Sequence, residues 1–187
     1  MGPPTLIPGL TRNLPDIYRC PAPLCATPSR NSPKPSAGNT LANNAMEIIE
    51  LTSPLTAQQV ADLLALMPEL DSEINFTAEM LQAAVADPAT HQFAVVEGGR
   101  IVGTASLCVS HSPTGRKGGI EDVVVSSACR GRHLGRLLME HIIAYARENL
   151  APIVLYLTSR PFRESANRLY LSVGFHPYET NVYKLPL

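Results

Sequence analysis

The sequence predicts an α/β protein of the α+β kind, in which one mixed β-sheet is flanked by helices. Three observations support this prediction. Apolar residues change several times between alternating and helical spacing, helix-start signals precede two of the helical runs, and glycines separate several of the runs. The expected element order is β-α-α-β-β-β-α-β-α-β. This order shows no internal repeat, which excludes a repeat protein.

The first 45 residues differ in composition from the rest of the chain. They contain nine of the 17 prolines and show no apolar periodicity. We therefore expect residues 1–45 to be a disordered or loosely attached Pro-rich extension. Three interpretations are open for it: a functional segment, a weakly basic targeting segment or a consequence of start-site choice. The folded domain is expected to span residues 46–187.

Local signals place the elements of this domain. Thr56-x-x-Gln59 is a capping box before a helical run, and Thr77 is expected to cap a second helix. Gly98-Gly99 lies between two alternating runs, as in a β-hairpin turn. The strands are expected at residues 47–51, 92–96, 101–109, 120–125, 153–157 and 182–185, and the helices after Thr56 and at 77–85, 134–149 and 161–173.

The segment 120–138 carries the most informative pattern. A strand of β-branched residues runs into a loop with Gly131 and Gly135, and a helix follows directly. Unpaired N–H groups at a helix N-terminus bind anions, and glycines let the chain bend around them. The loop is neither a Walker A motif nor a dinucleotide fingerprint. It predicts a phosphate or pyrophosphate site, with a purely structural turn as the alternative. Four basic residues lie beside it: Arg130, Arg132, His133 and Arg136.

Two motifs in this half of the chain resemble those of the GNAT superfamily of N-acetyltransferases. Arg130-Gly131-Arg132-His133-Leu134-Gly135 is similar to the acetyl-CoA motif Arg/Gln-x-x-Gly-x-Gly/Ala, with His133 in place of its central glycine. About 30 residues later the stretch 163–170, followed by Gly174-Phe175, is similar to the second motif, with Arg163 where asparagine is usual. The resemblance implies a mostly antiparallel sheet that is splayed between its fourth and fifth strands and flanked by about four helices.

The resemblance also implies acetyl-CoA as cosubstrate and no metal. Backbone groups of the loop would hold the pyrophosphate, and those of the preceding strand would hold the pantetheine arm. The expected cofactor-binding residues are Val123, Val124, Val125, Arg130, Gly131, Arg132, His133, Leu134, Gly135, Arg136, Arg163 and Asn167.

Amide formation from a thioester needs a base for the amine, a donor for the oxyanion and an acid for the thiolate. The resemblance implies Tyr170 as the general acid, although it could simply pack against the sheet. Glu121 and Asp122 are neighbours in a strand, so only one is expected to face the acceptor. We expect Glu121 to be the base, acting through water, unless both are ordinary strand-edge acids. Asp122 and Thr158 join Glu121 as expected substrate-binding residues, and the N–H near Val124 is the expected oxyanion donor.

The sequence does not indicate a single acceptor substrate. Segment 120–138 is similar to glucosamine-phosphate N-acetyltransferases, yet the acidic residue that they carry at the end of the fifth strand is missing. Three acidic loop residues suit a cationic amine, and two basic residues suit a phosphate. These are Glu69, Asp71 and Glu73, and Arg116 and Lys117. We expect a small-molecule primary amine, with glucosamine 6-phosphate as one alternative. A non-catalytic acetyl-CoA-binding sensor or interaction module is an alternative of another class.

Composition narrows the partners and the location. The formal net charge of -1 and the lack of a basic stripe argue against nucleic acid. No apolar run reaches the roughly 20 residues of a membrane span. Four cysteines form no disulfide framework, so reduced thiols in the cytoplasm are expected, and Cys108 and Cys129 lack the histidine partner of a nucleophile. An edge strand near 182–185 suggests a homodimer.

Overall fold

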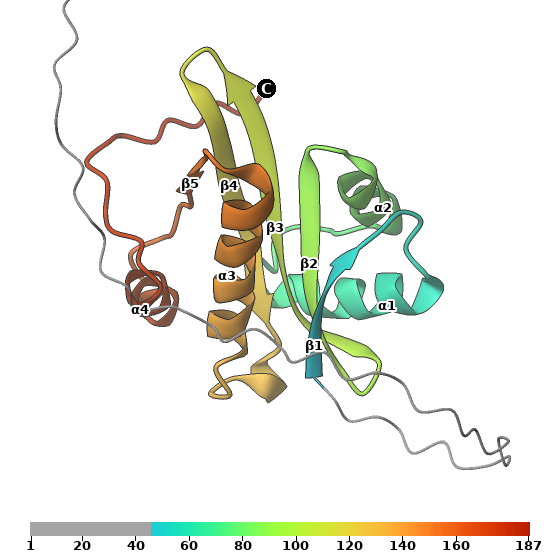
Figure 1. The fold of residues 1–187 in the computed structure, drawn as a ribbon. Helices are drawn as coiled ribbons and strands as arrows, with labels where there is room; N and C mark the ends of the chain where they lie inside the picture. Colours follow the sequence, from blue (N-terminus) through green and yellow to red (C-terminus); the bar gives the residue numbers. More distant parts are fainter. Residues whose placement is uncertain (1–45) are drawn as a thin grey trace, which may run out of the picture. The chain divides into compact units, whose positions relative to one another are not determined.

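The computed structural model describes residues 46–187, so the expected extension at residues 1–45 lies outside the described part. Five strands form one sheet in the order β1-β2-β3-β4-β5 (Figure 1). Neighbours from β1 to β4 are antiparallel, whereas β4 and β5 are parallel. The strands are β1 (Met46–Leu51), β2 (Thr90–Glu97), β3 (Arg100–Ser112), β4 (Gly115–Val125) and β5 (Val154–Tyr156). The helices are α1 (Ala57–Leu66), α2 (Ala78–Ala86), α3 (Leu134–Tyr145) and α4 (Glu164–Ser172).

Helices cover both faces of the sheet, with α1 and α2 on one side and α3 on the other (Figure 1). Alternation along β2 shows how the sequence produces the two cores, because successive strand residues point to opposite faces. Phe93 and Val95 are buried with α3, while Ala94 between them is buried with α1. None of the helices in residues 46–187 has the length and apolarity needed to span a bilayer.

The local signals form the structures that the sequence predicts. The Thr56 hydroxyl accepts a hydrogen bond from the N–H of Gln59, and the Gln59 side chain accepts one from the N–H of Thr56. Thr77 caps α2 through the N–H of Met80. Gly98 and Gly99 both have positive φ, 57° and 76°, as a tight hairpin turn requires.

Three expected elements are corrected. Helix α3 ends at Tyr145 and continues as a π-helical turn, because the Asn149 side chain donates to the Tyr145 carbonyl, a natural partner for a helical N–H. Helix α4 begins at Glu164 rather than at 161, since the side chain of Asn167 holds the preceding loop. Residues 182–185 form no strand. Their apolar side chains are exposed, and strand propensity without a hydrogen-bonded neighbour forms no sheet.

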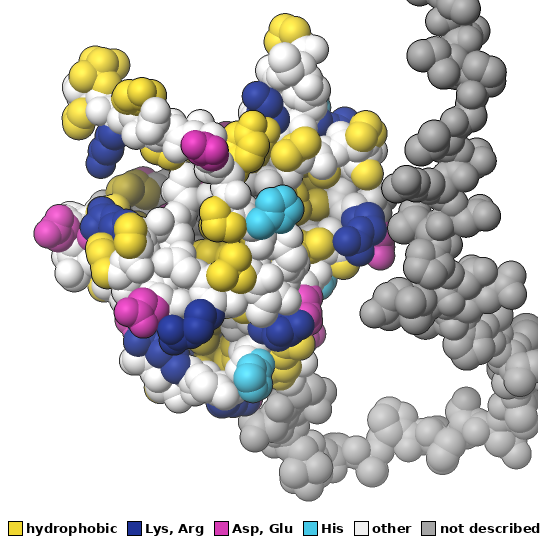
Figure 2. Space-filling view, turned by 90° about the vertical axis from the view of Figure 1, so that its left-hand side faces the viewer, with side chains coloured by type: hydrophobic (Ala, Val, Ile, Leu, Met, Phe, Trp, Pro, Cys, Tyr) yellow, Lys and Arg dark blue, Asp and Glu magenta, His cyan; other side chains and the backbone are white. Residues whose placement is uncertain are grey.

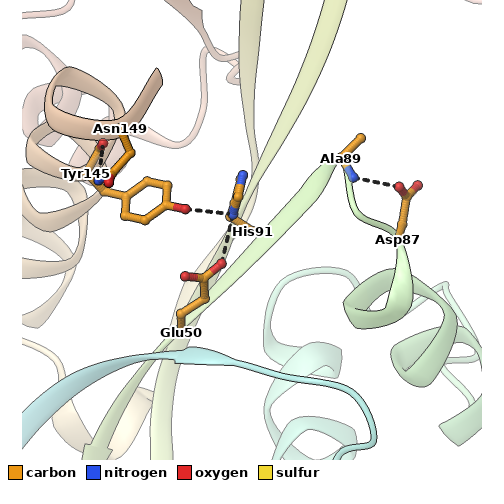
Figure 3. A network of polar contacts seen from close by, with 6 residues as sticks. All are labelled: Glu50, Asp87, Ala89, His91, Tyr145 and Asn149. Atoms are coloured by element: carbon orange, nitrogen blue, oxygen red, sulfur yellow. Dashed lines mark hydrogen bonds and ion pairs between the residues drawn. The ribbon is translucent and has the colours of Figure 1, made fainter. Parts of the chain in front are cut away.

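A polar network ties three elements together on the α3 side of the sheet (Figure 3). Nδ1 of His91 on β2 lies 2.8 Å from Oε1 of Glu50 on β1 and 3.0 Å from the hydroxyl of Tyr145 on α3. An ionised carboxylate can only accept, so His91 carries a hydrogen on Nδ1 when it bonds Glu50. The network links the edge strand β1 and the end of α3 to β2.

Candidate active site

The sheet opens where β4 leaves β5. Their pairing covers only Lys117–Gly119 and Val154–Tyr156, and the last pair is Gly119 with Tyr156. Beyond this point β4 continues to Val125 without a strand partner on its β5 side in the described part of the chain. The splay that the family resemblance implies between the fourth and fifth strands is therefore present. It leaves backbone groups of β4 free to meet a ligand.

A β-bulge shapes β4 at the same place. Ser106 of β3 pairs with Glu121, and Thr104 pairs with Val124, so two β4 residues lie opposite one β3 residue. The first of the two, Asp122, has a φ of 54°. Aspartate tolerates this left-handed conformation better than most residues. The bulge interrupts the alternation of side chains along β4, which matters for the acids described below.

The first cavity, of about 550 Å³, lies along the free edge of β4 and reaches the loop after β4 and α4. Ten of the twelve residues that we expected to bind acetyl-CoA line it. The two that do not are Arg132 and Asn167. The Arg132 guanidinium forms a two-pronged ion pair with Glu97, at 2.6 and 2.8 Å. The Asn167 side chain donates to the carbonyl of Arg160 and holds the loop before α4.

The loop after β4 has the geometry of an anion cradle. Gly131 and His133 both have positive φ, 78° and 60°, so His133 adopts the conformation that a glycine would take at this position of the motif. The first turn of α3 has no side-chain cap, in contrast to α1 and α2. Its N–H groups are therefore available to a ligand. A Cβ on Gly135 would lie 3.2 Å from Leu169 Cδ2, so glycine lets α3 approach α4 closely.

Charged side chains surround this cradle. Figure 2 shows Lys and Arg side chains gathered at the lower end of the face that carries α4, where the loop after β4 lies. Arg130 and Arg136 contribute to the cavity wall. The Glu69 carboxylate also lies there, 2.7 Å from the N–H of Ser127 and 3.3 Å from Nη2 of Arg130. Glu69 thus contacts the loop after β4, and it does not line the second cavity described next.

The second cavity, of about 360 Å³, lies on the other side of Tyr170. Its wall contains the three residues that we expected to contact the acceptor: Glu121, Asp122 and Thr158. We expected only one of the two acids to face the acceptor, whereas both residues line this cavity. The bulge turns Asp122 out of the strand's alternation, so both acids line the same space.

The two cavities meet at four shared residues: Leu70, Val123, Arg163 and Tyr170. Tyr170 therefore lies at the junction between a cavity beside the anion cradle and a cavity with acidic walls. Two groups near this junction have perturbed acidities. Burial raises the pKa of Tyr170, which the Arg163 charge partly offsets. Burial and, secondarily, the charge of Asp122 raise the pKa of Glu121.

Most of the charged loop residues that we considered for acceptor binding do not line the second cavity. Of the acids, only Asp71 lines the second cavity. Arg116 binds the carbonyl of Leu150 at 2.6 Å, and Lys117 lies within the paired part of β4, so neither lines either cavity. Sequence reasoning did not place Ser159 and Arg160 in this wall, and it expected Arg163 only at the cofactor. No local pattern marks them, because the wall combines segments far apart in the chain.

Comparison with known proteins identifies the class. Residues 57–175 match the model of the acetyltransferase (GNAT) family. The match covers more than half of the chain, and the protein belongs to this family. It is thus an acetyltransferase, and the family uses acetyl-CoA as cosubstrate.

Solved structures of proteins with different functions share this fold. An aminoglycoside acetyltransferase from an uncultured soil metagenomic sample, in complex with sisomicin, has a TM-score of 0.66 at 16% identity, covering 78% of this chain and 98% of that one. A transcriptional regulator from Bacillus halodurans C-125 has a TM-score of 0.64 at 19% sequence identity. The match covers 76% of this chain and 100% of that one. Glucosamine-6-phosphate N-acetyltransferase from Arabidopsis thaliana has a TM-score of 0.59 at 19% sequence identity. The match covers 75% of this chain and 98% of that one. At these identities the likeness concerns the fold alone.

Proposed function

We propose that the protein transfers the acetyl group of acetyl-CoA to the primary amine of a small molecule by direct attack. The observation that carries this proposal is the junction at Tyr170. One cavity beside an anion cradle and one acid-lined cavity meet there, so an activated acetyl group and an amine can approach each other.

The first cavity fits acetyl-CoA in charge and shape. The uncapped N-terminus of α3, with Arg130 and Arg136, suits a pyrophosphate. The unpaired edge at Val123–Val125 suits the amide groups of a pantetheine arm, because it offers backbone donors and acceptors in extended form. When bound, acetyl-CoA supplies a thioester that is activated for acyl transfer. Arg132 and Asn167 do not belong to this part of the proposal.

Each catalytic role follows from a property of one residue. Glu121 accepts a proton from the acceptor ammonium through water, and its raised pKa brings its basicity closer to that task. A backbone N–H near Val124 on the open side of β4 donates to the oxyanion, since Val124 itself pairs with Thr104 of β3. Tyr170 is protonated at neutral pH, since the ordinary pKa of tyrosine is about 10 and burial raises it further, so its hydroxyl is available to give a proton to the leaving thiolate.

The protons and bonds balance in this scheme. One N–C bond forms and one C–S bond breaks. The acceptor ammonium loses two protons: one reaches solvent through Glu121, and the other replaces the proton that Tyr170 gives to the thiolate. Asp122 lies beside Glu121 and contributes negative charge that attracts the ammonium form of the acceptor.

A thiol-release assay tests this function. Acetyl-CoA is combined with amino acids, polyamines, amino sugars with and without phosphate, and short peptides. Tyr170→Phe and Glu121→Gln should each lower kcat about 100-fold or more, the range for loss of a general acid or base. Tyr178→Phe is the matched control, because Tyr178 is 78% exposed and lines neither of these cavities. If kcat falls equally in Tyr178→Phe, or does not fall in Tyr170→Phe, the assigned roles are contradicted.

Two alternatives remain open within this experiment. Glucosamine 6-phosphate is favoured by the similarity of segment 120–138 to enzymes of that specificity, and it is a member of the acceptor panel. A non-catalytic acetyl-CoA sensor would instead show a higher melting temperature with acetyl-CoA and no thiol release with any acceptor. The fold itself is found in a structure described as a transcriptional regulator, so the fold does not decide between them.

We also propose that the protein forms a homodimer and is located in the cytoplasm. Strand β5 has only β4 as a partner in residues 46–187, and Val154 and Tyr156 on it are 56% and 42% exposed. An unpaired edge with exposed apolar side chains suits pairing with a second copy. Light scattering that gives a monomer mass at all accessible concentrations would contradict the dimer. The free thiols of Cys108 and Cys129 suit a reducing compartment.

A further inference from the structure

The acceptor cavity carries charges of both signs that do not pair with each other. The wall includes the carboxylates of Asp71, Glu121 and Asp122 and the guanidinium groups of Arg160 and Arg163. Within the described residues none of these five side chains forms an ion pair. These five residues line one cavity of about 360 Å³, so a small ligand that enters it meets charges of both signs. The separation of the two signs indicates a ligand that carries both.

The positive charges have a defined position in the wall. Nη2 of Arg163 donates to the carbonyl of Leu70 at 3.1 Å, which holds the side chain, while its other N–H groups have no hydrogen-bond partner within residues 46–187. The guanidinium carbon of Arg160 lies 5.8 Å from the centre of the Phe162 ring, within the range of a cation–π contact. Both arginines belong to the segment that leads into α4.

Two of the three negative charges come from a different element, the strand β4. Glu121 and Asp122 lie on β4 at the bulge, and the junction residue Tyr170 lies beside them in the same cavity. An ammonium group held by these carboxylates would therefore be close to the acetyl-transfer position. An anionic group on the same ligand would then face Arg160 and Arg163.

The wall also contains an unsatisfied hydroxyl. Oγ of Ser159 is buried and has no hydrogen-bond partner within residues 46–187. Ser159 lines the same cavity as the two arginines. Buried polar groups are rarely left without a partner, so this atom is a further sign that a polar ligand completes the wall.

We propose that the acceptor is a zwitterion in which the primary amine lies near an anionic group, with the amine on Glu121 and Asp122 and the anion on Arg160 and Arg163. This inference rests on the proposed function, because it assigns the substrate class of the same site. The anionic group is a carboxylate or a phosphate, which offer a guanidinium the same charge-assisted hydrogen bonds.

Equilibrium binding tests the inference without requiring turnover. Calorimetry on the full chain saturated with CoA would compare L-alanine and L-phenylalanine with their carboxamides, and glucosamine 6-phosphate with glucosamine. In at least one set the anion-bearing compound should bind about tenfold more tightly or better, as expected for a charge-assisted hydrogen bond. The set that shows the preference distinguishes carboxylate from phosphate.

Two variants and a control locate the effect. Arg160→Gln and Arg163→Gln should each reduce the preference for the anionic compound about tenfold. Arg168→Gln should leave it unchanged, because Arg168 lies on α4, pairs with Glu164 and lines neither cavity. A melting curve of each variant establishes that it is folded.

The outcomes separate this inference from the function on which it rests. Equal binding within every set, absence of binding, or a preference that survives in both arginine variants overturns the zwitterion assignment. Tyr170-dependent thiol release with a neutral amine, together with such binding data, leaves the acetyltransferase function standing. Selective binding of the zwitterion without thiol release supports the assignment and contradicts the proposed catalysis.

Discussion

Oε1 of Glu121 lies 3.2 Å from the position that a Cβ atom on Gly119 would occupy. Residues two apart in a strand share a face, so the Glu121 side chain folds back over Gly119. Gly119 is also the last β4 residue that pairs with β5. The absence of a side chain at this position therefore leaves room for the proposed base at the point where the sheet opens.

Gly119→Ala should lower kcat/KM about tenfold or more while the protein stays folded, because the added methyl displaces the Glu121 carboxylate. The acidic limb of the pH–rate profile should shift as well, since the surroundings of Glu121 change. In the wild type this limb should lie above the ordinary range of a glutamate, as the raised pKa of Glu121 requires. Steady-state kinetics from pH 5 to 9 give both readouts.

Gly118→Ala is the matched control for Gly119→Ala. Its Cβ would lie 2.8 Å from Leu155 Cδ2 and 2.9 Å from Leu107 Cδ1, on the core side of the sheet. It should cost about 1–3 kcal/mol of stability through overpacking. An unaltered pH profile in Gly119→Ala would show that this glycine does not position Glu121.

His133→Gly should be more stable than His133→Ala, which reverses the usual order of these two residues. At a φ of 60° alanine keeps the left-handed strain of about 1–2 kcal/mol, and glycine removes it. The greater chain entropy of unfolded glycine offsets about 0.5–1 kcal/mol of this gain. Urea unfolding of both variants would measure the difference, and greater stability of the alanine variant would contradict the strain.

The Glu69→Gln substitution should tighten acetyl-CoA binding about twofold to fivefold, the range for one exposed ion pair. The carboxylate places negative charge in the proposed cofactor cavity and pairs with Arg130 at 3.3 Å. Glutamine keeps an oxygen that can accept from the N–H of Ser127, so the loop should retain its shape. Calorimetry at two salt concentrations checks this, and the gain should shrink at high salt. Weaker binding would indicate instead that the charge of Glu69 holds the loop.

Asp62→Ala should destabilise the protein by about 1–3 kcal/mol, because it leaves the buried N–H of Ile101 without its acceptor. Burial alone would raise the pKa of Asp62, but hydrogen bonds from Arg100, Ile101 and Gln58 outweigh it and lower the pKa. A lowered folded-state pKa stabilises the protein above the ordinary value of 3.8, and this contribution is lost as the pH falls through the folded-state pKa. The stability gap between wild type and variant should therefore narrow below about pH 4.

Arg100→Gln serves as the comparison for Asp62→Ala. The Arg100 side chain is 62% exposed, so its loss should cost about 1 kcal/mol or less. Denaturant titrations at pH 7 and at pH 3.5 measure both variants. A stability gap for Asp62→Ala that does not change with pH would contradict the lowered pKa.

The local signals in the sequence determined the elements that depend on near neighbours. The caps at Thr56 and Thr77, the turn at Gly98-Gly99 and the helix after the loop at Gly131 each need contacts within about four residues of the chain. Ten of the twelve expected cofactor residues line the first cavity. Nearly all of them lie close together in the chain, on one strand, one loop and the start of one helix, so a local pattern was enough to predict their place. The two exceptions are Arg132, which pairs with Glu97, and Asn167, which donates a hydrogen bond to the carbonyl of Arg160.

Only the tertiary structure decided the acceptor side. The bulge at Asp122 arises from the pairing of β4 with β3, and it places both acids in one cavity against the alternation of a regular strand. The cavity wall joins three segments that are far apart in the chain, which contain Asp71, Glu121, and Ser159 with Arg163. The segment 182–185 has the composition of a strand but no hydrogen-bonding neighbour in the described residues. A sequence pattern reports the preferences of a segment, whereas pairing, bulges and cavity walls depend on which distant segments meet.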